Sequence, residues 1–151
     1  MKKSFSNSYF TLFYLLTNKN IVLLYSKMAM YSRKILIMKR LSQIYNMLSD
    51  KNRLRILKLL EHRPMCVCEL TYVLGIRQPS VSRHLKKLKE ADLIDSRPDK
   101  TWNEYFINRR GDDYSRIIME NLSGWLNDDS IILKDLKKSA NANRDSLCGN
   151  Q

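Results

Sequence analysis

The stretch MCVCELTYVLGIRQPSVSRHLKKLKEADLI, residues 65–94, decides the fold. Its first part has apolar residues at helical spacing up to Gly75, and glycine tolerates the left-handed backbone that ends a helix. A second helix is expected from Pro79 to Asp92, because proline suits the first position of a helix. Two helices joined by a tight turn predict a helix-turn-helix.

The second helix separates an apolar face from a basic face. At about 100° per residue, Val81, Leu85 and Leu88 fall within an arc of about 60°. Three basic side chains point away from that arc: Arg83, Lys86 and Lys87. Such a face can simply be a solvated surface. The preceding helix and turn instead favour a helix that enters the major groove of DNA.

The residues that follow predict a wing. Leu93 to Arg97 and Trp102 to Ile107 have strand character on either side of a turn signal. A hairpin directly after the second helix is typical of a winged helix. Arg97 and Lys100 are expected to contact backbone phosphates of DNA.

The flanking segments predict more helices. Asp50 is a candidate N-cap for a helix that Pro64 ends, with Leu54, Leu57 and Leu60 on its buried face and Ile56 at the edge. Apolar stripes also occur before this helix, near Leu41, and after Gly111. The expected fold is mainly α with a small β-hairpin: a winged helix-turn-helix that forms a homodimer through its N- and C-terminal helices.

Charge and composition divide the chain into three parts. Residues 1–37 have no acidic residue and are expected to be a poorly structured N-terminal extension, with Met38 as the preferred start of translation. Residues 38–126 are expected to form the DNA-binding domain with dimerisation helices, and residues 127–151 a C-terminal helix and a frayed tail. The apolar runs at 9–16 and 21–25 are too short for a membrane span.

The same features indicate the class of function. A net charge of +12 favours a polyanionic partner, and an odd count of three cysteines favours a reducing compartment, the cytoplasm. No nucleophile–base pair, paired-carboxylate signature or glycine-rich phosphate loop supports an enzyme.

Residues 48–108 resemble the ArsR/SmtB family of metal-responsive winged-helix repressors. The resemblance is carried, in order, by RLRILKLL, CVCEL and QPSVSRHLKKLKEADLI. It implies a homodimeric repressor that leaves its operator DNA when an inducer binds, with no permanent cofactor. It also implies operator contacts from Gln78, Ser80, Ser82, Arg83 and His84, although His84 is as compatible with packing at the edge of the core.

The cysteines Cys66 and Cys68 are the predicted inducer ligands. On an ideal helix they would point about 160° apart, so they converge only if the turn after Pro64 is not helical. Thiolates select soft ions. The resemblance is greatest to arsenite sensors, which implies As(III) or Sb(III) as the inducer, but Thr71 stands where their motif often has a further cysteine.

Several alternatives stay open for the sulfur site. Cys148 is a candidate third ligand, although an idle thiol in the tail is favoured at this stage. The inducer can also be another soft metal, such as cadmium, lead or zinc, or the cysteines can respond to oxidation. Finally, Cys66 and Cys68 can be inert buried residues.

Overall fold

The computed structural model describes residues 8–99 and 102–148, with side chains from residue 21 onward. The chain divides into two compact units, and the boundary in the sequence falls between Arg40 and Leu41. Helix α1, Ser8–Leu48, runs through the first unit and into the start of the second. Among the described helices, none combines the length and the hydropathy that a membrane crossing requires.

The helical state of residues 8–37 corrects the prediction of a poorly structured extension. The α1 segment contains neither glycine nor proline and is rich in leucine, methionine and lysine, so nothing in it interrupts a helix. Many of its large apolar side chains are nevertheless exposed, including Leu24 and Tyr31. The proposal that translation starts at Met38 is not affected by this helix and remains a prediction.

Helix α2, Lys51–His62, is the centre of the second unit. Its N-cap is Asp50, as predicted, and the Asp50 carboxylate accepts hydrogen bonds from the backbone N–H groups of Asn52 and Arg53 at 2.9 and 3.0 Å. Ile56 is fully buried rather than at an edge, whereas Leu54 is only partly buried. The reason is that α2 packs against neighbours on several sides, so its residues 56–60 are all buried.

The helix-turn-helix follows the predicted pattern. Helix α3, Val67–Leu74, ends at Gly75, which has the left-handed φ of +67°. Helix α4, Gln78–Glu90, has Pro79 in its first turn and buries Val81, Leu85 and Leu88 almost completely.

The wing has one strand more than predicted. Strands β2, Ile94–Asp99, and β3, Trp102–Ile107, form the expected antiparallel hairpin. Strand β1, Met65–Cys66, pairs with the other side of β3, which gives the order β1-β3-β2. In this register Cys66 lies opposite Glu104.

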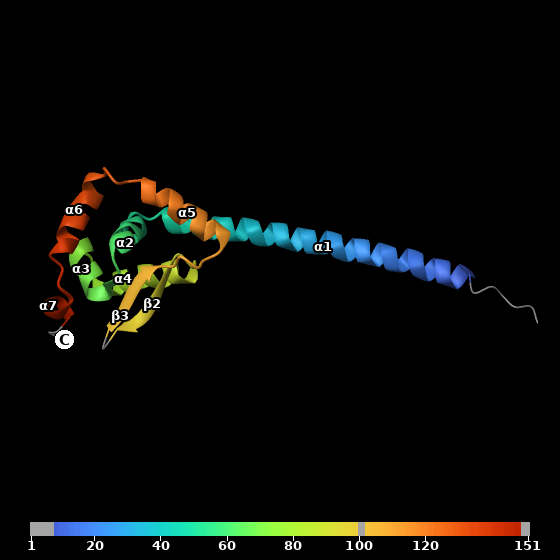
Figure 1. The fold of residues 1–151 in the computed structure, drawn as a ribbon, viewed down its shortest axis with the longest axis horizontal. Helices are drawn as coiled ribbons and strands as arrows, with labels where there is room; N and C mark the ends of the chain where they lie inside the picture. Colours follow the sequence, from blue (N-terminus) through green and yellow to red (C-terminus); the bar gives the residue numbers. More distant parts are fainter. Residues whose placement is uncertain (1–7, 100–101, 149–151) are drawn as a thin grey trace, which may run out of the picture. The chain divides into compact units, whose positions relative to one another are not determined.

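Three helices complete the unit: α5, Asp113–Gly124, α6, Ser130–Ala140, and α7, Arg144–Cys148. The prediction of a frayed tail is wrong for residues 139–148, because this segment packs on its own chain. Helix α6 contacts α2 and α3, and α7 contacts α3 (Figure 1). Arg55 of α2 holds Asp135 of α6 with two hydrogen bonds of 2.6 and 2.8 Å.

Candidate functional site

Helix α4 presents a polar and basic face to solvent. Its core residues face inward, so the intervening side chains are exposed: Gln78, Ser82, Arg83, Lys86 and Lys87. Ser80 is half-buried. The helix therefore brings the residues predicted to contact an operator onto one accessible surface, with His84 as the exception.

His84 turns toward the start of α2. Its side chain is only 16% exposed, and its Nδ1 atom lies 3.9 Å from Oδ1 of Asp50. Burial lowers the pKa of His84, and the nearby Asp50 carboxylate only partly opposes this effect. The imidazole is therefore mainly neutral at pH 7, and this position fits packing at the edge of the core better than contact with a phosphate.

The wing carries Arg97 on its exposed side. Two nitrogens of the Arg97 guanidinium contact Oε2 of Glu104 at 2.7 and 2.9 Å, and the guanidinium stacks on Phe106 at 5.5 Å from the ring centre. Lys100, the other predicted phosphate contact, lies outside the described residues.

The sulfur atoms of three cysteines lie close together near the start of α3. The Sγ atoms of Cys66, Cys68 and Cys148 all lie within 4.8 Å of one another. Cys66 and Cys148 are 3.4 Å apart, and Cys68 is joined to Cys148 as a disulfide with a Cα–Cα distance of 5.9 Å. Across the described residues, this is the one group of three or more Cys, His, Asp or Glu side chains gathered closely enough to hold a metal ion.

The local backbone allows Cys66 and Cys68 to converge. Cys66 is extended, with φ −87° and ψ 170°, because it ends β1 and caps α3, whereas Cys68 lies in the first turn of the helix. This is the non-helical geometry that the sequence analysis required. Glu69 stabilises it, since its Oε2 atom accepts the backbone N–H of Cys66 at 2.8 Å.

Burial controls the chemistry of the sulfur site. Cys66 and Cys148 are 2% and 1% exposed, and Cys68 is half-buried. Burial raises the pKa of the Cys66 thiol, and the nearby carboxylate of Glu69 adds to this effect. The free Cys66 side chain is therefore a protonated thiol at neutral pH, which must lose its proton to bind a cation.

The C-terminal segment is tied down by arginines. Arg63, at the end of α2, donates to the carbonyl oxygens of Ser139 and Ala142 at 3.0 and 3.3 Å. Arg144, at the start of α7, pairs with Asp99 and Glu104 of the wing. These contacts place Cys148 beside Cys66, which the sequence analysis did not favour. No local pattern shows this arrangement, because it depends on side chains some 80 residues apart.

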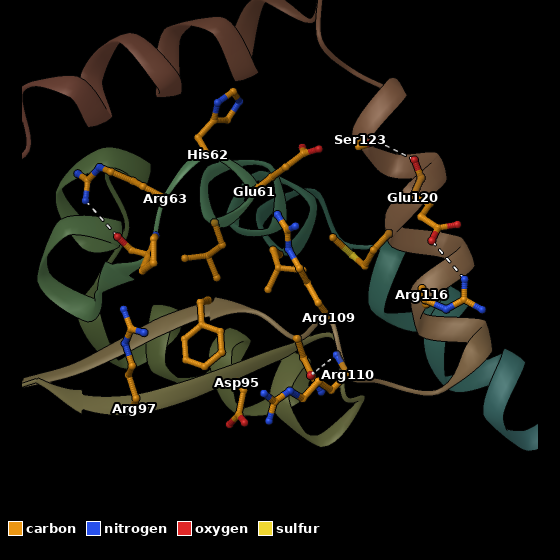
Figure 2. A pocket seen from close by; sticks show the side chains of 16 residues that line it. Glu61, His62, Arg63, Asp95, Arg97, Arg109, Arg110, Arg116, Glu120 and Ser123 are labelled. Carbon is orange, nitrogen blue, oxygen red and sulfur yellow. Dashed lines mark hydrogen bonds and ion pairs between the residues drawn. The ribbon is translucent and has the colours of Figure 1, made fainter.

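A separate cavity of about 860 Å³ lies between α2, the wing and α5 (Figure 2). Its lining includes none of the cysteines and no residue of α4. Its lining carries both signs of charge, with three carboxylates, Glu61, Asp95 and Glu120, and five arginines: Arg63, Arg97, Arg109, Arg110 and Arg116 (Figure 2).

Comparison with known proteins agrees with this architecture. Residues 50–96 match the family described as "Bacterial regulatory protein, arsR family". An uncharacterized HTH-type transcriptional regulator of Methanocaldococcus jannaschii is 43% identical over 67 residues, which are 44% of this chain and 75% of that protein. An arsenical resistance operon repressor of Staphylococcus aureus is 39% identical over 70 residues, which are 46% of this chain and 67% of the relative.

A solved structure shows the same fold. The homodimeric winged helix-turn-helix DNA-binding domain from Mycobacterium bovis superposes with a TM-score of 0.53 at 22% identity, covering 61% of this chain and 82% of the other. The family match and the winged helix-turn-helix fold together define a DNA-binding transcriptional regulator. The chain belongs to the arsR family of bacterial regulatory proteins.

Proposed function

We propose that the protein is a homodimeric repressor that leaves its operator when arsenite or antimonite binds Cys66, Cys68 and Cys148. The observation that carries the proposal is the meeting of three sulfur atoms within 4.8 Å. Soft thiolate ligands suit a trivalent metalloid, and three of them fill its coordination shell. The Staphylococcus aureus relative, an arsenical resistance operon repressor, supports the same inducer.

The reaction at the site is an exchange of ligands. The reduced protein offers three thiols, and arsenite, As(OH)₃, exchanges its three hydroxides for three sulfurs with release of three waters. The disulfide between Cys68 and Cys148 must be reduced before this exchange. Cys66 and Cys68 lie at the start of α3, which packs against α4, so a change of geometry at the sulfurs reaches the recognition helix directly.

DNA binding is proposed to follow the usual geometry of the fold. Helix α4 enters the major groove, where Gln78 and Arg83 are suited to read base edges and the neighbouring serines and lysines to bind phosphates. Arg97 adds a phosphate contact from the wing. His84 is the weakest candidate, because it faces Asp50.

Dimerisation is proposed through apolar side chains that the described chain leaves exposed. Ile117 of α5 is 48% exposed, Trp125, which follows the last residue of α5, is 53% exposed, and Tyr45 near the end of α1 is 61% exposed. Large exposed apolar groups at these positions are suited to a two-fold interface that places two α4 helices about one DNA turn apart. On α6, only Ile131 and Leu133 are exposed enough to join this proposed dimer interface. Ile132 is buried within its own chain.

The test is operator binding by fluorescence anisotropy with fully reduced protein. Arsenite and antimonite are expected to lower the affinity, with cadmium, lead and zinc as further titrants. Cys66→Ser, Cys68→Ser and Cys148→Ser should each keep operator binding and raise the arsenite concentration needed for release by about tenfold or more, equivalent to at least about 1.4 kcal/mol of lost inducer binding. X-ray absorption should find three sulfurs around arsenic. If none of these ions releases the operator, the proposal is wrong.

Oxidation is a second candidate function, supported by a different observation. Cys68 and Cys148 have a Cα–Cα distance of 5.9 Å, within the usual range for a disulfide. A peroxide would oxidise the two thiols to this disulfide while being reduced to water. Peroxide treatment should then release the operator from wild type but not from Cys148→Ser, whereas Cys66→Ser should respond normally.

A further inference from the structure

Arg144 lies between the sulfur site and the wing. It begins α7 and is four residues before Cys148, about one helical turn away. Its guanidinium pairs with Asp99 of β2, with Glu104 of β3 at 2.8 Å, and more distantly with Glu69 of α3 at 3.9 Å. The side chain is only 23% exposed, so solvent screens these pairs incompletely.

Glu104 is shared between two arginines. Its Oε1 atom accepts from Arg144, and its Oε2 atom accepts from Arg97, the proposed phosphate contact. Burial alone would raise the pKa of Glu104, but the hydrogen bonds from Arg97 and Arg144 outweigh it and hold the pKa below its ordinary value. Glu104 is therefore an anion at neutral pH. Because Arg144 and Arg97 share this one carboxylate, the strength of the pair between Glu104 and Arg97 depends on Arg144.

The backbone joins the same groups. Cys66 lies opposite Glu104 in the pairing of β1 with β3. Glu69 accepts the N–H of Cys66 and also faces Arg144. A change at the sulfurs therefore has two short routes to the wing, one through strand pairing and one through α7.

We infer that Arg144 couples the sulfur site to the DNA contact of the wing. With α7 in place, Arg144 offsets the charges of Asp99 and Glu104, and Arg97 is free to exchange Glu104 for a DNA phosphate. An ion bound by Cys66, Cys68 and Cys148 together sets a new position for the Cys148 sulfur and shifts α7, which withdraws Arg144. Glu104 then has Arg97 as its one remaining partner and binds it more tightly, and the Asp99 carboxylate loses the cation that it pairs with. This inference rests on the proposed function.

The test is a double-mutant cycle in reduced, ion-free protein, read as the operator dissociation constant. Arg144→Gln should weaken binding by about threefold to tenfold, which corresponds to about 0.7–1.4 kcal/mol. Glu104→Gln should strengthen binding, because it frees Arg97. In the Glu104→Gln background, Arg144→Gln should cost clearly less than it does in wild type, since the shared carboxylate is gone. Arg144→Lys should restore part of the affinity.

A second readout separates coupling from a merely structural role. Arsenite should raise the operator dissociation constant of wild type by a certain factor. In Arg144→Gln this factor should be smaller by about threefold or more, because the DNA contact of the wing is already weakened before arsenite binds. If wild type is released by arsenite and Arg144→Gln has the same ratio, the inference is overturned. If wild type is not released at all, the proposed function fails, and the ion-free cycle still decides whether Arg144 and Arg97 compete for Glu104.

Discussion

The Sγ atom of Cys66 lies 3.4 Å from the Sγ atom of Cys148, although 82 residues separate the two in the chain. Both sulfurs are almost fully buried, whereas Cys68 is half-buried. In reduced, folded protein, we therefore expect iodoacetamide to modify Cys68 first and Cys66 and Cys148 much more slowly. Peptide mass spectrometry over time measures the three rates, with the urea-unfolded chain as the control. A Cys148 that reacts as fast as in urea would contradict the packing of α7.

The affinity for cadmium should depend on pH, unlike that for arsenite. Burial raises the pKa of Cys66, so this thiol is protonated at pH 6–8 and must release its proton to bind Cd²⁺. Each thiol proton released makes binding about tenfold stronger per pH unit. Arsenite exchanges hydroxide for thiol without net proton release.

Calorimetric or competition titrations at pH 6, 7 and 8 measure this slope. In Cys66→Ser, the slope of cadmium affinity against pH should be smaller by about one power of ten per pH unit, because one thiol proton fewer is released. An unchanged slope in Cys66→Ser would remove Cys66 from the cadmium site.

The ion pair between Arg55 and Asp135 should be important for stability. Asp135 is 4% exposed, and its partner donates through two nitrogens. Asp135→Ala leaves the Arg55 guanidinium without its partner next to α6 and should cost about 3 kcal/mol. Asp113→Ala is the matched control, because Asp113 is 83% exposed in its pair with Arg116 and should cost less than about 1 kcal/mol. Urea unfolding gives both values, and equal losses would refute the anchoring of α6.

Two glycine substitutions should have different effects. Gly75 ends α3 with φ +67°, and alanine in this left-handed conformation should cost about 1 kcal/mol even though no atom lies within 4 Å. Gly124 is the last residue of α5 and also has open space around it, so Gly124→Ala should be neutral or slightly stabilising. Thermal unfolding of the two variants tests this difference in sign.

The exposed face of α4 should determine operator recognition. Arg83→Ala is expected to lose about 1–3 kcal/mol of operator binding if the guanidinium contacts a base. Arg116→Ala is the control. It removes the same charge from an exposed position on α5, outside α4, and should change the affinity for the operator only slightly. Comparable losses in the two variants would indicate only a general effect of charge.

The helix-turn-helix could be predicted because its signals are local. Gly75 and the spacing of Val81, Leu85 and Leu88 determine a helix end and a buried face within one short segment, and the structure confirms both. The wing hairpin is equally local, since its two strands are close in the sequence and Asp99 pairs with Trp102.

The sulfur site could be predicted only in part. The need for a non-helical turn at Cys66 followed from helix geometry, and the structure has it. Strand β1 is only two residues long, too short to leave a pattern in the sequence. The position of Cys148 depends on Arg63 and Arg144, which hold the C-terminal segment through carbonyl groups and distant carboxylates. Such contacts have no periodicity that a sequence can reveal.

The five residues of α7 lie outside the segment, 50–96, that defines the family. The helix that supplies the proposed third sulfur thus lies outside the sequence segment that contains α4. A change at Cys148 alone would alter which ions the protein accepts and leave its operator unchanged. The proposed preference for an ion can therefore be changed at Cys148 without changing the exposed residues of α4 that are proposed to read the operator.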